Sequence, residues 1–251
     1  MKGLGIGRKL IIAMMAAIVI LTGCGSRGGS GSGDANGVPL MFFNSAPDDK
    51  YLEKNTCMYV GCNEYSAGQY QAEYVLEKLS GQNEINVALL KGPSDHSGAV
   101  GRTKGAKKTF VASGKTIHYV FDDYANWSRD KAKEQFGLFL KTGQPVDCVL
   151  CNNDEMALGV IDACKAAGIE PSDIWICGVD ATADGCTAIK AGEMAFTVYQ
   201  PAGLQGEAII ELTKELLNTG SSDGVEGVTE DGKHVFVPFE KVDAGNVDQY
   251  M

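Results

Sequence analysis

The feature that most limits the possible folds of this 251-residue chain is a regular alternation of short apolar runs with longer segments of helical periodicity. Strands that alternate with helices of this kind form βαβ units, in which a parallel sheet is covered by helices on both faces. The sequence therefore predicts an α/β fold. Strands are expected at 38–44, 58–62, 85–90, 116–121, 148–151, 174–179, 195–199 and 234–239, and helices at 66–79, 98–112, 129–141, 155–167, 183–191 and 203–217.

The first 23 residues have the pattern of a bacterial lipoprotein signal peptide. Basic residues precede an apolar run over 10–21, and a small residue precedes Cys24. A transmembrane helix needs about 20 apolar residues, so this run favours a cleaved signal over a membrane span. The pattern predicts removal of residues 1–23 and acylation of Cys24, which would hold the chain on the outer face of a membrane. Residues 24–37 are rich in Gly and Ser and would form a flexible tether.

The charge balance limits the partners of the chain. With residues 1–23 removed, 19 Lys and Arg remain against 32 Asp and Glu, which gives a net charge of −13. A surface of this sign repels nucleic acid, so no nucleic-acid partner is expected. The remaining 228 residues are enough for one or two domains with substantial cores.

The chain has eight cysteines, and one of them, Cys24, is assigned to the lipid. Most of the other seven lie inside apolar strand and helix patterns, where a free cysteine behaves as a small buried hydrophobe. Cys148 and Cys151 form a C-x-x-C, but no second Cys/His pair follows at zinc spacing, which disfavours metal or redox chemistry. Cys57 and Cys62 flank a predicted strand and could pair; the sequence leaves this open.

Polar side chains follow nearly every predicted strand. In open α/β sheets, ligands bind in the crevice beyond the carboxyl ends of the strands. Carboxylates and carboxamides there can accept hydroxyl hydrogens, Arg and His can donate, and Trp can stack on the apolar face of a sugar ring. The set predicts a neutral polyhydroxylated ligand. It consists of Asn44, His96, Arg102, Trp127, Asn152, Asn153, Asp154, Asp180 and Gln200.

Motifs for catalysis are missing from this inventory. The sequence has no G-x-S-x-G elbow, no H-E-x-x-H and no phosphate-binding G-x-x-x-x-G-K-[ST]. The three histidines share no common spacing, so neither a metal site nor a cofactor is expected. An enzyme is therefore disfavoured, and so is a DNA-binding repressor, because no basic helix-turn-helix is found.

Six segments resemble, in the same order, those of type I periplasmic binding proteins of the glucose/galactose branch. They are VPLMFFN, LLKGPSDHSGAVGR, the segment around Trp127, CNNDEMALG, ICGVDA and FTVYQ, and the resemblance extends from Val38 to the C-terminus. It implies a type I fold whose two lobes close on a monosaccharide and deliver it to the membrane subunits of an ABC importer. Carried over by position, the sugar-contacting residues are Asn44, His96, Arg102, Trp127, Asn153, Asp180 and Gln200.

Each of these residues also has a purely structural interpretation. Either Asn153 or Asp154 could cap the helix that follows, and the family pattern favours Asp154 as the cap and Asn153 as the ligand contact. Seven such residues in the family order favour the functional interpretation. The alternatives are a turn or cap residue for Asn44 and Asp180, a solvated loop residue for His96, a surface ion pair for Arg102 and a core or exposed loop position for Trp127.

The sequence departs from the family pattern at three places. Gly98 stands where the glucose/galactose receptors have a carboxylate two residues after the histidine, which removes one acceptor for sugar hydroxyls. Gln200 replaces an Asn, with a longer reach and the same chemistry. The loop 80–86 lacks the alternating oxygen ligands that bind calcium in some members, so no calcium site is expected.

The resemblance also implies a domain organisation with one partial and one complete lobe. In the family, three β-α units precede the strand that matches 38–44; at ~30 residues per unit, on the order of 90 residues have no counterpart here. A sheet so reduced is expected to leave Leu204, Ile209, Leu212 and Leu216 poorly buried. The alternative function is therefore a truncated remnant, or a protein that docks to a membrane partner, with weak or no sugar binding. The expected parts are the signal peptide 1–23, the tether 24–37, a partial N-terminal lobe 38–60 with 200–233, a C-terminal lobe 61–199, and a C-terminal strand and tail 234–251.

Overall fold

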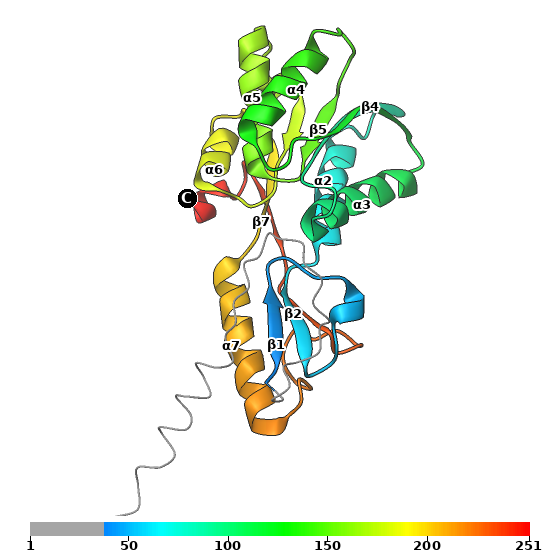
Figure 1. Cartoon of the computed structure of the whole chain (residues 1–251). Helices are drawn as coiled ribbons and strands as arrows, with labels where there is room; N and C mark the ends of the chain where they lie inside the picture. The colour runs from blue at the N-terminus through cyan, green and yellow to red at the C-terminus, as the bar shows by residue number, and fades with distance from the viewer. Residues whose placement is uncertain (1–37) are drawn as a thin grey trace, which may run out of the picture. The chain divides into compact units, whose positions relative to one another are not determined.

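The computed structural model describes residues 38–251 (Figure 1), so the predicted signal peptide, Cys24 and the tether lie outside the described residues. Two compact units are formed, one by residues 38–62 with 201–238 and the other by residues 63–200 with 239–251. Within residues 38–251, no helix combines the length and the apolar character needed to cross a membrane.

The first unit is a small three-stranded parallel sheet with one long helix. Its strand order is β1-β2-β8, and β2 is buried along its whole length because apolar side chains from both sides cover it. The helix α7 ends at Gly220, whose left-handed backbone (φ 74°) terminates it. The elements are β1 (Leu40–Phe43), the 3-10 helix η1 (Asp49–Tyr51), β2 (Cys57–Gly61), α7 (Ala202–Thr219) and β8 (His234–Phe236).

The apolar face of α7 is better covered than the sequence predicted. Leu212 and Leu216 are 0% and 6% exposed and pack with Met58, Val60 and other residues of the same sheet. Ile209 is half-buried against this cluster, and Leu204 alone of the four is largely exposed, at 47%. The expectation was therefore wrong for Leu212 and Leu216, because three strands suffice to cover the C-terminal half of the helix.

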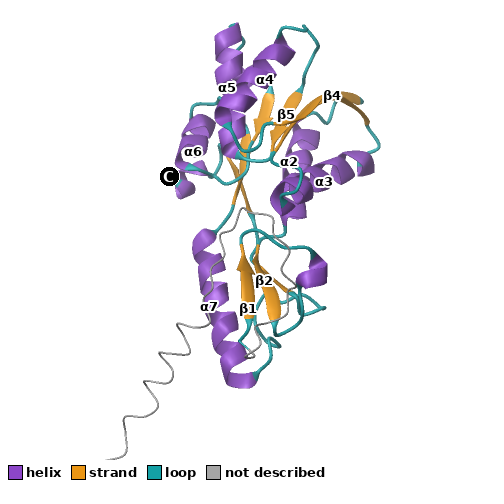
Figure 2. Cartoon of the chain, in the orientation of Figure 1, coloured by secondary structure: helices purple, strands orange, loops and turns teal. Residues whose placement is uncertain are grey.

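The second unit contains a six-stranded sheet of order β4-β3-β5-β6-β7-β9, with helices on both faces (Figure 2). The first five strands are parallel, and β9 is antiparallel to β7. The strands are β3 (Glu84–Lys91), β4 (Thr116–Tyr124), β5 (Cys148–Cys151), β6 (Trp175–Cys177), β7 (Phe196–Tyr199) and β9 (Glu240–Asp243). The helices are α2 (Glu64–Lys78), α3 (Ser97–Ala112), α4 (Arg129–Leu140), α5 (Asp154–Ala167) and α6 (Ala183–Lys190), with 3-10 turns η2 (Pro171–Asp173) and η3 (Val247–Tyr250).

The strand order reverses direction next to β3, because the chain moves from β3 to β4 and then returns to β5 on the other side. Right-handed crossovers place the helices of the two directions on opposite faces, so α3 lies on one face and α4 to α6 on the other. Such a reversal is where open α/β sheets bind ligands. The predicted α/β class with parallel sheets is confirmed.

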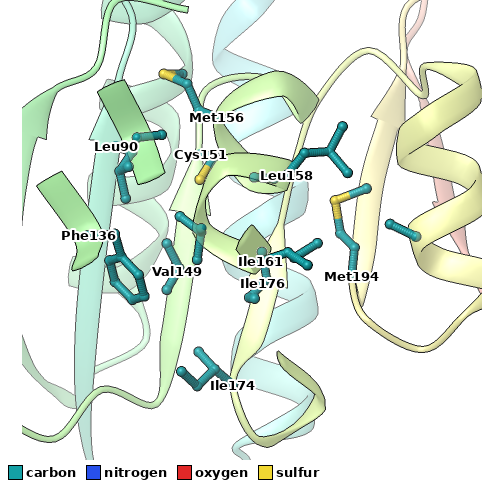
Figure 3. Close-up of a cluster of buried hydrophobic side chains, with 14 of the residues drawn as sticks. Leu90, Phe136, Val149, Cys151, Met156, Leu158, Ile161, Ile174, Ile176 and Met194 are labelled. Atoms are coloured by element: carbon teal, nitrogen blue, oxygen red, sulfur yellow. The ribbon is translucent and has the colours of Figure 1, made fainter. Parts of the chain in front are cut away.

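The core of the second unit lies under α4, α5 and α6. Leu90, Val149 and Ile176 of three neighbouring strands meet Phe136 of α4 and Ile161 of α5 (Figure 3). All five side chains are at most 2% exposed, which is typical of a closely packed interior. Burial of these strands on both faces explains why their sequences are continuously apolar.

The prediction of a final strand at 234–239 is wrong in part. β8 ends at Phe236, and Pro238 cannot donate a hydrogen bond to a strand ladder. The chain then forms β9, which pairs antiparallel with β7 and buries only Val242 completely. The predicted segment 234–251 therefore contributes one strand to each unit.

All seven cysteines between residues 38 and 251 are free and buried. Cys57 and Cys62, which the sequence left as a candidate pair, are therefore not bonded to each other. Burial raises the pKa of the thiols of Cys148 and Cys151 well above its usual range. In this part of the chain, no three His, Cys, Asp or Glu side chains are grouped so that they could hold a metal ion.

Candidate functional site

Six of the seven predicted site residues belong to the second unit and lie at the carboxyl end of its sheet. His96 caps α3, Trp127 follows β4, and Asn153 caps α5. Asp180 and Gln200 follow β6 and β7, and Arg102 lies on the second turn of α3. The seventh residue, Asn44, follows β1 in the first unit.

Arg102 is the centre of this group. Its side chain is only 6% exposed, and its Nε donates to Oε2 of Glu64 at 2.6 Å. Its Nη1 donates to the backbone carbonyl of Asn152 at 2.6 Å and lies 3.6 Å from Oδ1 of Asp180. Its Nη2 donates to Oε1 of Gln200 at 3.4 Å. A guanidinium this deeply buried has to be paired, so the interpretation of Arg102 as a surface ion pair is wrong.

The carboxamide of Asn152 joins the strands on either side of the reversal point. Its Oδ1 accepts from the backbone N–H of Gly92 at 3.1 Å and from Oγ1 of Thr103 at 3.3 Å. Because Gly92 follows β3 and Asn152 follows β5, these bonds tie two strand ends and α3 together. Asn152 therefore supports the site and does not have its side-chain oxygen available for a ligand.

Trp127 and His96 form the aromatic side of the site. The half-buried indole of Trp127 meets the imidazole of His96 edge to face, with ring centroids 5.1 Å apart. The guanidinium carbon of Arg102 lies 5.8 Å from the centre of the indole. Trp127 also packs against the hydrophobic core of the unit. Its side chain thus combines core packing with contacts to two predicted site residues.

His96 is held in one tautomer by its own helix. Its Nδ1 accepts from the backbone N–H of Gly98 at 3.1 Å, which caps the start of α3. Burial and the nearby Arg102 lower the pKa of His96, so the neutral ring is favoured at neutral pH. With Nδ1 acting as the acceptor, the proton lies on Nε2, and the ring offers a donor there.

Asn153 and Asp154 have the opposite capping roles to those predicted. The side chain of Asn153 accepts from the backbone N–H of Met156 at 3.0 Å and is the N-cap of α5. The carboxyl group of Asp154 is fully buried and accepts from Oγ1 of Thr197 at 2.6 Å and from the backbone N–H of Thr182 at 2.7 Å. Asp154 therefore joins α5 to β7 and α6, and the prediction that it caps α5 is wrong. Asn153 retains its amide hydrogens as donors.

Three of the predicted residues have left-handed backbone conformations, which are uncommon outside glycine. The φ angles are 64° for Asn44, 64° for Trp127 and 115° for Asp180. Conformations of this kind cost about 1–3 kcal/mol each and persist where the surrounding structure enforces them, often at functional sites. At Asp180, the backbone N–H is held by the carbonyl of Val198 at 2.8 Å.

Two carboxyl groups, those of Asp180 and Glu64, lie beside the single guanidinium of Arg102. Burial raises the pKa of Asp180 to about 6, although Arg102 acts in the opposite direction and Glu64 adds to the increase. The side chain of Asp180 is 33% exposed, whereas that of Glu64 is only 10% exposed. Glu64 was not among the site residues predicted from the sequence. An acid in the first turn of a helix is common because it interacts with the helix dipole, so its position carries no signal of this contact.

The loop 80–86, in which no calcium site was expected, lies next to a lysine. Nζ of Lys115 donates to the backbone carbonyls of Leu79 at 3.3 Å, Ser80 at 3.0 Å and Gln82. These carbonyls belong to the end of α2 and the turn after it, where helix carbonyls lack intrahelical partners. An ammonium group of the chain itself thus provides a positive charge at this loop.

Comparison with known proteins identifies the family. Residues 32–222 match the model of a family described as a periplasmic binding protein domain. The chain belongs to the periplasmic binding protein family. Its fold is the type I fold of that family, with mostly parallel sheets and helices on both faces. The predicted resemblance is confirmed at this level, and membership of the glucose/galactose branch stays a prediction.

Individual relatives carry names that refer to different small-molecule ligands. A Rhizobium meliloti protein named as a rhizopine-binding protein is 32% identical over 218 residues, which are 86% of this chain and 66% of the relative. The D-galactose/methyl-galactoside binding periplasmic protein of Haemophilus influenzae is 28% identical, over 88% of this chain and 69% of the relative. An ABC transporter solute binding protein from Bacillus halodurans, solved with bound myo-inositol, is 30% identical with a TM-score of 0.70, over 85% of this chain and 69% of that chain. The chain thus spans about two thirds of the length of these proteins.

Proposed function

We propose that this chain is an extracytoplasmic solute-binding lipoprotein that binds a neutral six-membered polyol, a monosaccharide of the glucose/galactose type or a cyclitol, for an ABC importer. The observation that carries this proposal is the Arg102 network. Two carboxyl groups and a carboxamide each lie within 3.6 Å of the guanidinium of Arg102, at the carboxyl end of the sheet. Such closely spaced donors and acceptors match the alternating hydroxyl groups of a sugar ring.

The charge of this network favours a neutral ligand. Glu64 and Asp180 lie beside the single guanidinium of Arg102, so the positive charge is already compensated. An anionic ligand would bring a further negative charge next to two carboxyl groups in a partly buried site, where Coulomb repulsion is weakly screened. A carboxylate can instead accept a ligand hydroxyl hydrogen without a net charge change.

Trp127 supplies the apolar surface that a sugar ring requires. One face of a pyranose presents C–H groups, and an indole can cover them. Trp127 is half-buried, contacts His96 and Arg102, and has a left-handed backbone conformation in the loop between β4 and α4. We assign it the stacking role, with His96, Asn153, Asp180, Gln200, Asn44 and Arg102 as the polar contacts.

The proposed location and partner rest on the sequence pattern and on the family. The lipoprotein pattern before Cys24 supports a lipid anchor on the outer face of a membrane. Similar proteins of known structure, such as the one from Bacillus halodurans, are solute binding proteins of ABC transporters. The membrane subunits of an ABC importer are therefore the proposed protein partner.

Isothermal titration of the full chain with D-galactose, D-glucose, myo-inositol, D-ribose and D-xylose tests the proposal. We expect saturable binding of at least one neutral ring and much weaker binding of its uronic acid analogue. If no ring binds with a Kd below about 1 mM, equivalent to about −4 kcal/mol, the proposal is wrong, and the alternative of a protein with weak or no sugar binding is favoured.

The two tryptophans provide a matched spectroscopic control. Trp127 lies at the carboxyl end of the sheet, whereas Trp175 begins β6 and contacts Tyr74 at the opposite end of its strand. A ligand-induced change in tryptophan emission should be lost in Trp127→Phe and kept in Trp175→Phe. The reverse result would contradict the assigned position of the ligand.

A further inference from the structure

We propose that Glu64 is a specificity-determining acid of the ligand site, with one carboxylate oxygen holding Arg102 and the other accepting a hydroxyl hydrogen from the ligand. This assignment rests on the proposed function, and it adds a residue of α2 to a site that the sequence assigned to strand ends and α3. It also accounts for the absence of a carboxylate at position 98.

The two oxygens of Glu64 have different surroundings. Oε2 receives the Nε hydrogen of Arg102 at 2.6 Å. Oε1 accepts no hydrogen bond within residues 38–251, and it is not one of the fully buried unpartnered side-chain atoms of this part of the chain, so it is open to a ligand although the side chain as a whole is only 10% exposed. An ionised carboxylate has about four acceptor positions, so this open oxygen can accept a hydrogen from a ligand hydroxyl.

Glycines bring Glu64 into this position. A Cβ on Gly101 would lie 2.6 Å from Cβ of Glu64, and one on Gly105 would lie 2.0 Å from the carbonyl oxygen of Tyr65. On the other helix, a Cβ on Gly68 would lie 1.7 Å from the carbonyl oxygen of Arg102. α2 and α3 can therefore approach only because these positions lack side chains. The close contact sets the start of α2 directly beside Arg102.

A side chain at position 98 would lie close to the carboxylate of Glu64. A Cβ on Gly98 would lie 3.6 Å from the carboxylate carbon of Glu64 and 3.2 Å from Nδ1 of His96. The missing side chain leaves room beside Arg102, and the carboxylate of Glu64 reaches that room from α2. The site therefore keeps an acid next to Arg102 and His96, supplied from a different helix.

The test compares Glu64→Gln with the wild-type full chain by isothermal titration against the tightest neutral ring and a set of its monodeoxy analogues. Loss of a charge-assisted hydrogen bond should weaken binding of the parent ring about 10- to 100-fold. One deoxy analogue should bind more weakly than the parent ring to the wild type, and this difference between analogue and parent should be much smaller for Glu64→Gln. Such coupling to a single hydroxyl is not produced by a residue that only supports Arg102.

Moving the acid back to α3 provides a second, independent variant. The double variant Glu64→Ala with Gly98→Asp should recover much of the affinity that Glu64→Ala loses, because the new carboxylate would occupy the room beside Arg102. Glu77→Gln, an exposed position on the same helix, is the control for the loss of one negative charge and should bind like the wild type.

The outcomes separate this inference from the proposed function. If the wild type binds a ring and Glu64→Gln keeps its Kd within about twofold, the assignment of Glu64 is overturned while the proposed function stands. Equal weakening for every deoxy analogue, with no rescue by Gly98→Asp, overturns it as well. If the wild type binds no ring, the proposed function fails and the assignment of Glu64 fails with it.

Discussion

The indole of Trp127 occupies the space that a side chain at position 92 would need. A Cβ built on Gly92 would lie 2.3 Å from Cζ2 of Trp127, far inside van der Waals contact. Gly92 follows β3, and its backbone N–H is held by the carboxamide of Asn152. The strand end therefore cannot move aside easily, and the glycine is what allows the ring to cover it.

Gly92→Ala is accordingly predicted to displace the ring of Trp127. The methyl group would overfill the contact, which typically costs about 1–3 kcal/mol of stability. Binding of a ring that stacks on the indole should weaken up to about tenfold. Tryptophan emission and isothermal titration measure the two effects. Gly81→Ala is the matched control, because a Cβ at position 81 meets nothing within 4 Å. Equal behaviour of the two variants would contradict the prediction.

Local patterns predicted most of the elements because alternation and helical periodicity are properties of neighbouring residues. The strands β3 and β5 and the helix α5 are found where the sequence placed them, within a few residues. β9 was missed because its sequence, Glu240–Asp243, has one apolar residue, and its pairing partner β7 lies about 40 residues earlier in the chain. Pairing between distant segments leaves no local pattern.

The candidate site was predictable to the extent that strand ends are predictable. Arg102, Asp180 and Gln200 were predicted individually, and the structure brings them together at one guanidinium. Glu64 was missed because its partner lies 38 residues away on another helix. The roles of Asn153 and Asp154 were exchanged because both side chains can cap a helix, and the choice depends on threonines distant in sequence.

The buried carboxyl group of Asp154 is predicted to make folding less favourable as the pH rises. Burial raises its pKa to about 7; the nearby Asp180 adds to this, and hydrogen bonds from Thr197 and Thr182 oppose it. The unfolded chain has a pKa near 3.9 for Asp, so the folded form binds the proton more tightly. Its stabilising contribution is therefore complete below about pH 4, falls as the pH rises to about 7, and is lost above that.

Asp154→Asn should remove this dependence. Between pH 4.5 and 7.5, the free energy of unfolding of the variant should rise relative to that of the wild type by on the order of 2–4 kcal/mol. Thermal melting of both proteins across this range measures the difference. Asp184→Asn, which alters an exposed carboxyl group on α6, should show no such trend. A constant difference between Asp154→Asn and the wild type would contradict the prediction.

Lys115 is predicted to stabilise the second unit through the carbonyls of Leu79, Ser80 and Gln82. Lys115→Met keeps the apolar stem and removes the ammonium, leaving these acceptors without their charged donor. The free energy of unfolding should fall by about 1–3 kcal/mol. Calcium and chelators should leave the melting temperature of the wild type unchanged. Lys108→Met, at an exposed position of α3, is the control. Stabilisation of the wild type by calcium would contradict this role for Lys115.

Acylation of Cys24 is predicted to be measurable by counting thiols. The chain has eight cysteines, and the seven within residues 38–251 are buried and free. A thiol reagent should therefore react slowly with the folded protein, since burial raises the pKa of several of these thiols and disfavours the reactive thiolate. After unfolding, a chain whose Cys24 sulfur carries a lipid should titrate seven thiols, and an unmodified chain eight. Cys24→Ser should titrate seven thiols in either case and should lose labelling by a radioactive fatty acid. Eight thiols in the unfolded wild type purified from bacterial membranes would show that Cys24 is not acylated.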